Sequence, residues 1–253
     1  MIVSIHQPNY IPWLGYFYKI WASDVFVLLD NVQYNSQSFT KRVFVRKNIT
    51  DADHSYISVP IIKHHRLTNI NDLVICNRYN WREKHLNKIY NSYHKAPNFN
   101  LYFPQIKHSL LASKSQLLLS EINETMIFSV LDILGIQKNI VRSSDLPIKD
   151  VRKDDLTAAI TLHLGGTAYL SGVGAKKYQH QETYDNQKIE LIFSDLGSFM
   201  KTHPPQYPVA FDSSFSILDA LFYIGKEGVL QLFEAYRDSE MANSGADYSR
   251  RGN

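Results

Sequence analysis

The sequence has little of several features that would assign it to a defined class of protein. It contains one cysteine, Cys76, which excludes an internal disulfide and any cysteine-based zinc cluster. Its densest apolar run, residues 25–29, is far shorter than the roughly 20 residues that a membrane-spanning helix needs. The formal net charge of +3 is too small an excess to indicate nucleic-acid binding. From these absences we expect a cytoplasmic protein with no membrane span and no nucleic-acid partner.

Three motifs that commonly identify nucleotide-binding proteins and hydrolases are also absent. The sequence has no G-x-x-x-x-G-K loop, no G-x-G-x-x-G fingerprint after a strand and no G-x-S-x-G elbow. The segment SGVGA, residues 171–175, could still present backbone amides to a phosphate. The histidines do not follow metal-ligand spacing, so we expect no metal site. The cofactor is left open, with ATP and Mg²⁺ among the options.

The remaining composition and patterning are typical of a globular α/β protein. Of the 253 residues, 44% are hydrophobic and 20% are charged, and short apolar runs alternate with segments of helical periodicity. We therefore expect a Rossmann-like, mostly parallel sheet with right-handed crossovers. The expected strands are residues 2–5, 25–29, 139–144, 167–170 and 189–193, with a further short strand at 73–75.

The same patterns predict the domain organisation. We expect one α/β domain over residues 1–237, with a helical insert at about 78–135 and a small antiparallel β element within 38–62. Other helices are expected at 13–22, 154–164, 176–184 and 217–225. Residues 238–253 are polar, and we expect them to form a frayed C-terminal tail.

Polar residues follow the expected strands, at the sheet edge where ligands of open parallel sheets bind. The residues at these carboxyl ends are His6, Gln7, Asp30, Ser143, Ser144, Asp145, Ser171, Gly172, Ser194 and Asp195. For Ser143 to Asp145 and for Ser194 with Asp195, helix capping is the simpler explanation. His6, Gln7 and Asp30 are the better candidates for contact with a ligand.

The loop that follows the first expected strand is the strongest local candidate for a binding site. Its polar residues are His6, Gln7, Asn9 and Tyr10. Pro8 and Pro12 stiffen the loop, so these groups would lose little entropy on meeting a ligand. Gly15 lies in the first turn of the next helix, where its missing side chain would let a ligand approach closely. The alternative is a packed loop whose polar atoms satisfy one another.

Two further groups of residues have both a functional and a structural interpretation. Asp30 could act as a general base, a Mg²⁺ ligand or a partner for a sugar hydroxyl, or it could be a turn residue. Lys41, Arg42, Arg46 and Lys47 form a basic segment that could grip a phosphate. A solvated edge strand protected by its charges is the alternative for this segment.

Four segments of the chain resemble the WbqC-like family over about residues 2 to 235. They are HQPNYIPWLGYF at the start, DNVQY after the second strand, YLSGVGAKKY at 169–178 and SILDALFYIG at 216–225. The residues that match the family pattern are His6, Gln7, Pro8, Asn9, Pro12, Trp13, Gly15, Asp30, Gln33, Tyr169, Ser171, Gly172, Tyr207, Ser216 and Asp219. Where the family usually has an Asn-Arg-Asn-like step, this chain has Lys41-Arg42-Val43, so Arg42 alone matches there.

The resemblance implies a tailoring step in the synthesis of O-antigen or another surface polysaccharide. The leading hypothesis is transfer of an acyl or aminoacyl group, such as glycyl, to an amino sugar that is nucleotide-linked. His6 would be the general base or a phosphate contact, and Asp30 a base or a sugar-hydroxyl partner. Arg42 and Arg46 would clamp the diphosphate. The other proposed substrate contacts are Gln7, Asn9, Tyr10, Trp13, Gly15, Gln33, Tyr169, Ser171, Gly172 and Tyr207.

Two other functions remain open at this point. One is nucleotidyl transfer to a sugar or small acid, because the strand, His-containing loop, helix and strand also resemble the start of adenylate-forming transferases. In those enzymes a His-x-Gly-His motif holds phosphate, whereas this chain has Tyr16 at the position of the second histidine. The other is a non-catalytic protein that holds a glycan intermediate. A homodimer is compatible with each of these functions.

Overall fold

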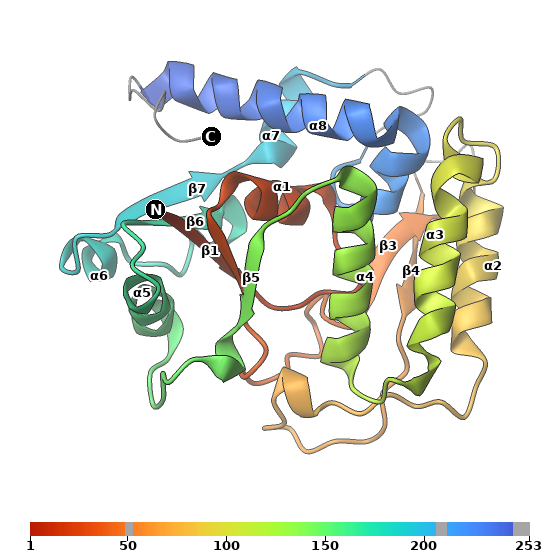
Figure 1. Ribbon diagram of the computed structural model, residues 1–253, viewed down its shortest axis with the longest axis horizontal. Coiled ribbons are helices and arrows are strands. Elements are labelled where there is room, and N and C mark those ends of the chain that lie inside the picture. Colours follow the sequence, from red (N-terminus) through yellow and green to blue (C-terminus); the bar gives the residue numbers. More distant parts are fainter. Residues whose placement is uncertain (49–52, 206–211, 245–253) are drawn as a thin grey trace.

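A five-stranded parallel sheet forms the centre of the molecule (Figure 1). The computed structural model describes residues 1–48, 53–205 and 212–244. The strands lie in the order β5-β2-β1-β6-β7, and every neighbouring pair is parallel. Their bounds are β1 (Ile2–His6), β2 (Val25–Leu28), β5 (Asn139–Arg142), β6 (Ala168–Gly172) and β7 (Glu190–Ser194). The predicted α/β class and mostly parallel sheet are confirmed.

Helices cover both faces of this sheet, because its central strands carry buried residues on both sides. On one face, Phe26 and Leu28 of β2 pack with α1 (Leu14–Ala22). Above α1 lie α7 (Leu196–Thr202) and α8 (Ile217–Ser244) (Figure 1). On the other face, Val25 and Val27 pack with α5 (Lys153–His163) and α6 (Gln181–Asp185). Since α1 and α5 cover opposite faces, the winding of the sheet reverses between β1 and β6.

The helical insert and the antiparallel element lie together beside one edge of the sheet (Figure 1). The insert contains α2 (Trp81–Tyr93), α3 (Phe99–Ala112) and α4 (Leu119–Leu134), within the predicted limits of about 78–135. The antiparallel pair is β3 (Arg42–Arg46) with β4 (His54–Ser58). Both elements are therefore present where the sequence predicted them.

Three local predictions were wrong. Residues 73–75 form no strand but only isolated bridges, Val74 with Leu118 and Ile75 with Ile61. The expected helix at 176–184 is confined to the short α6, after a 3₁₀ turn over Val173–Ala175.

The third concerns the C-terminus, where α8 continues to Ser244, past the predicted boundary at 237. The turn just before this boundary is anchored, because the rings of Phe233 and Tyr236 pack on Tyr18 of α1, 5.6 and 4.8 Å between ring centroids. The helix continues from this anchored turn, and the Ser239 hydroxyl donates to the Tyr236 carbonyl at 2.8 Å. Residues 245–253 of the predicted tail lie outside the described residues.

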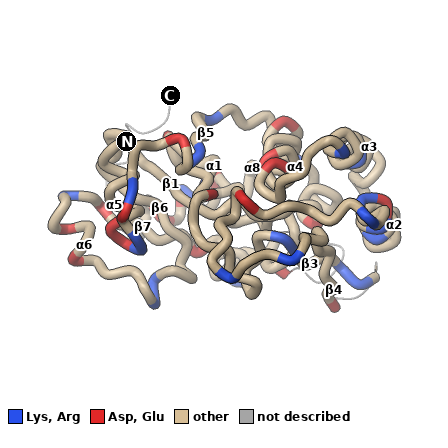
Figure 2. The backbone as a smooth tube through the Cα atoms, turned by 90° about the horizontal axis from the view of Figure 1, so that it is seen from below, with Lys and Arg blue, Asp and Glu red and all other residues tan. Residues whose placement is uncertain are grey.

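Two general properties of the described residues bear on function. None of the described helices combines the length and the apolar character that crossing a membrane requires. Basic and acidic positions are spread over both halves of the described chain (Figure 2), in keeping with the small net charge.

Candidate functional site

The point where the sheet reverses its winding brings the ends of β1 and β6 together. Ser4 of β1 is level with Leu170 of β6, and continuing this register places His6 level with Gly172. A Cβ atom added to Gly172 would meet no other atom within 4 Å, so there is open space beside this end of β6. Carboxyl ends at such a reversal are the usual ligand site of open α/β sheets.

His6 ends β1 on the α1 side of the sheet and is held in one orientation. Its Nδ1 lies 3.0 Å from the carbonyl oxygen of Gln7. A carbonyl only accepts, so Nδ1 carries the hydrogen and Nε2 keeps its lone pair. Trp13 and Tyr16 contact the imidazole edge-on, with ring centroids at 5.4 and 4.9 Å. Burial, with a contribution from the positive charge of Lys19, lowers the pKa of His6 to about 3, so the ring is neutral at pH 7.

Lys19 is a member of this site that the sequence analysis missed. It lies in α1 and is only 3% exposed, and burial lowers the pKa of its ammonium to about 7. Within the described part of the chain, no carboxylate forms an ion pair with it. The sequence does contain a sign that this lysine is buried. It lies between apolar and aromatic residues of a helix that has no polar face.

The loop after His6 is tied to the segment that precedes β3. The side-chain oxygen of Gln7 accepts a hydrogen bond from the Thr40 hydroxyl at 3.3 Å. The amide nitrogen of Asn123, in α4, donates to the carbonyls of Pro8 (2.8 Å) and Thr40 (2.7 Å). Asn9 is 3% exposed, and its Oδ1 has no hydrogen-bond partner among the described residues. The predicted stiff loop is therefore present, with one buried acceptor still available.

Aromatic rings extend from His6 to the β3–β4 pair. Trp13 lies 6.2 Å from Phe39, and Phe39 lies 5.5 Å from Phe44, measured between ring centroids. Phe44 in turn stacks on Tyr56 at 4.3 Å. We call these four side chains, Trp13, Phe39, Phe44 and Tyr56, the ring row.

Arg42 and Gly15, two of the predicted substrate contacts, lie along the ring row. The Arg42 guanidinium lies 4.8 Å from the centroid of Tyr56 and donates to the carbonyl of Gln37 at 2.9 Å. Its Nε is buried and has no hydrogen-bond partner within the described ranges. A side chain on Gly15 would come within 3.2 Å of the Trp13 indole nitrogen, so the indole rests against this glycine.

Asp30 is at the same sheet edge, but its carboxylate is engaged. It is 2% exposed and accepts hydrogen bonds from the Ser143 hydroxyl, the Ser144 amide and the Ser144 hydroxyl at 3.0, 2.9 and 2.7 Å. These bonds join the end of β2 to the 3₁₀ turn after β5. Asp30 thus positions the edge of the sheet, in line with the turn interpretation.

Two predicted contacts are buried away from the sheet edge. Tyr10 is fully buried, and its hydroxyl pairs with Nδ1 of His85 at 3.0 Å in the helical insert. Arg46 is also fully buried and forms an ion pair with Asp219 of α8, with Nε and Oδ1 at 2.6 Å. The predicted diphosphate clamp of two arginines is therefore not assembled, and only Arg42 keeps a position near the site.

The remaining predicted contacts are dispersed. Tyr169 and its neighbour Ser171 lie on the α5 and α6 face, where Tyr169 stacks on Tyr184 at 5.5 Å. Gln33 is exposed and donates to the carbonyl of Arg66 at 2.9 Å. Tyr207 lies outside the described residues. Asp195 caps α7 by accepting from the Ser198 amide at 3.0 Å, which confirms the capping interpretation.

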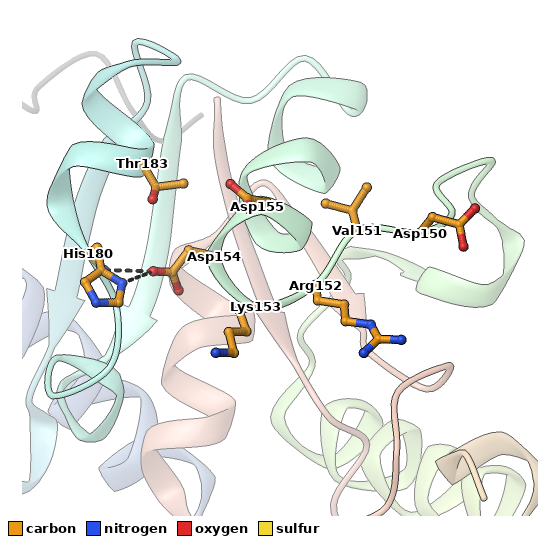
Figure 3. A pocket seen from close by; sticks show the side chains of 8 residues that line it. All are labelled: Asp150, Val151, Arg152, Lys153, Asp154, Asp155, His180 and Thr183. Carbon is orange, nitrogen blue, oxygen red and sulfur yellow. Dashed lines mark hydrogen bonds and ion pairs between the residues drawn. The ribbon is translucent and has the colours of Figure 1, made fainter. Parts of the chain in front are cut away.

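A second hollow opens at the same sheet edge, on the α5 and α6 side (Figure 3). It has a volume of about 420 Å³ and is lined by Asp150, Val151, Arg152, Lys153, Asp154, Asp155, His180 and Thr183. Asp154 accepts from the backbone and the ring nitrogen of His180, both at 2.8 Å, and so fixes the start of α6. The sequence does not reveal this group, because residues 150–155 and the pair His180 and Thr183 come together only in the fold.

Ligands for a metal ion would require a cluster of suitable side chains. Among the residues that the structure describes, no three His, Cys, Asp or Glu side chains converge in such a group. The sheet edge instead offers a neutral imidazole, a buried ammonium and aromatic faces, which suit an anionic organic ligand with a ring.

A sequence profile described as the WbqC-like protein family matches residues 7–231 of the chain. The chain belongs to this family. The match includes the loop after β1 and the part of α8 up to residue 231. The chain is also similar to an uncharacterized protein, Rv1507c, of Mycobacterium tuberculosis (strain ATCC 25618 / H37Rv), with 27% identity over 226 residues. That alignment covers 89% of this chain and 94% of the relative, so the two proteins correspond along nearly their whole length.

Proposed function

We propose that this WbqC-like protein forms an amide by transferring an acyl or aminoacyl group to the amine of a nucleotide-linked sugar, as a tailoring step in surface-polysaccharide synthesis. The observation that carries the proposal is the state of His6. Its Nδ1 donates to the Gln7 carbonyl, and the ring is neutral at pH 7. Nε2 therefore keeps a lone pair, on a residue that ends β1 at the sheet edge where ligands bind.

His6 would act as the general base of this reaction. The sugar amine attacks the carbonyl carbon of an activated acyl donor, and a carbon–nitrogen bond forms. The bond from that carbon to the leaving group, a thiolate or a phosphate, then breaks. Nε2 of His6 takes the proton that the amine loses and passes it to the leaving group or to water. The donor is an acyl thioester or an acid activated with ATP and Mg²⁺.

The neighbouring residues would bind the substrates. The ring row offers aromatic faces on which a nucleobase or a sugar can stack. Arg42, at one end of the row, has an unpartnered Nε that could donate to a phosphate oxygen. Gln7 and Asn9 would contact polar groups of the sugar. Asp30 would hold the end of β2 in place through Ser143 and Ser144 and would not touch the reacting atoms.

The experiment compares His6→Gln with a matched histidine variant in an amide-forming assay. The substrates are a panel of nucleotide-linked amino sugars with acyl-CoA donors, or with amino acids plus ATP and Mg²⁺. His94 provides the control because its Nδ1 also lies 3.0 Å from a backbone carbonyl, that of Tyr90, but at the end of α2. We expect His6→Gln to lower the rate at least about a hundredfold, the contribution of a general base, and His94→Gln to leave it unchanged. Equal rates in the two variants would contradict the proposal.

A further inference from the structure

Lys19 is a buried amine whose charged form has no counter-charge among the described residues. The side chain is 3% exposed, and its ammonium forms no ion pair or side-chain hydrogen bond with any residue that the structure describes. Lysine is almost never fully buried in proteins unless it is paired. By contrast, the buried guanidinium of Arg46, which lies away from the sheet edge, has the carboxylate of Asp219 against it. The partner that Lys19 lacks within the described fold is thus an anion.

The geometry of α1 directs this ammonium toward the end of β1. Side chains of a helix lean toward its amino terminus, so Lys19 extends back over positions 15 and 16. Tyr16 contacts the His6 ring, and the charge of Lys19 acts on the same imidazole. The helix packs against both β1 and β6. A short loop joins the carboxyl end of β1 to α1, so the amino terminus of α1 lies toward the carboxyl edge of the sheet.

We propose that Lys19 binds an oxyanion of the substrate, a phosphate or a carboxylate, beside His6 at the point where the sheet reverses its winding. The proposal rests on the proposed function only in taking His6 as the reacting group. An anion there would also remove the repulsion that Lys19 exerts on a protonated His6, which lowers the pKa of that imidazole. The base would then become stronger when the substrate is bound.

Thermal unfolding of the full chain with inorganic anions tests the proposal without any turnover. Sodium phosphate, sodium pyrophosphate and sodium acetate are each titrated against sodium chloride of equal ionic strength. We expect at least one of the first three to raise the Tm of the wild type in a saturable way. Phosphate or pyrophosphate acting alone would indicate the nucleotide-linked substrate, and acetate acting alone would indicate the acyl donor.

Lys19→Met keeps the length of the side chain and removes its charge. We expect this variant to bind the effective anion at least about tenfold more weakly, the loss of one charge-assisted hydrogen bond. Its Tm without added anion should equal or exceed that of the wild type, because an unpaired buried charge has been removed. Lys107→Met is the control for net charge, since Lys107 is exposed on α3 of the helical insert.

Three results would overturn the proposal. They are equal anion binding by Lys19→Met and the wild type, a Tm of Lys19→Met below that of Lys107→Met, and no stabilisation of the wild type by any of the three anions. Failure of this test leaves the His6 assay unaffected. In the same way, equal rates of His6→Gln and His94→Gln would not change anion binding at Lys19, so the two proposals fail separately.

Discussion

Replacing Arg46 with methionine should destabilise the fold strongly, because it leaves a carboxylate buried without its partner. Arg46 is 0% and Asp219 is 1% exposed, and two bonds of 2.6 and 3.1 Å join the guanidinium to the carboxylate. Burial raises the pKa of Asp219 to about 6, so the carboxyl is ionised at neutral pH. Breaking such a buried pair from one side costs about 3–5 kcal/mol. For a chain of this size that corresponds to a fall in Tm of about 6–20 °C.

Urea unfolding at pH 7.5 measures this effect, with stability taken from the midpoint and the slope. The double variant Arg46→Met with Asp219→Leu provides the control, because it removes both charges and fills the space with apolar atoms. We expect it to recover most of the loss, since buried pairs replaced by apolar residues are often as stable as the original. A loss below about 1 kcal/mol in Arg46→Met, together with weaker binding of a sugar nucleotide, would instead assign Arg46 to the ligand and refute this structural role.

Two further predictions concern the pH dependence of stability and the packing of the sheet. The pKa of His6 is about 3 in the folded chain against 6.5 in the unfolded one, so the unfolded state binds more protons between these values. The free energy of unfolding should therefore fall as the pH drops from 6.5 toward 3. Urea unfolding should show a shallower fall for His6→Asn. An unchanged dependence of the unfolding free energy on pH would contradict the burial of His6. Gly166→Ala should cost about 1–3 kcal/mol, because a Cβ there would lie 2.7 Å from Val3 Cγ2 and 2.9 Å from the Thr161 carbonyl oxygen. Gly174→Ala, with no atom within 4 Å of the added Cβ, is the control, and equal melting temperatures of the two variants would refute the packing argument.

The sheet could be predicted from the sequence because its signal is local. Each strand is a short apolar run followed at once by polar or glycine residues, as in Ile2–His6 and Ala168–Gly172. Parallel strands buried on both faces have this pattern, and connecting helices separate them. The end of α8 could not be predicted in the same way. Its polar composition indicates fraying, whereas the helix continues to Ser244 from a turn that the contact of Tyr236 with Tyr18 anchors to α1.

The candidate site could be predicted only where one residue followed a strand directly. His6 was found because it follows a buried strand, and its position at the sheet edge needs no information from distant parts of the chain. Arg46 was misassigned because its partner, Asp219, is remote in sequence and belongs to another element. Lys19 was missed because its significance is the lack of a counter-charge, which only the packed fold reveals.

The measurement that tests the central claim most directly is mass spectrometry of the reaction products of the wild type. The purified protein is incubated with nucleotide-linked amino sugars and each class of acyl donor, and the sugar is examined for a new amide. We expect one combination to give a product whose mass has increased by the acyl group, and we expect His6→Gln not to give it. Saturable binding of the sugar nucleotide with no amide from any donor would refute amide formation and identify a binding protein instead.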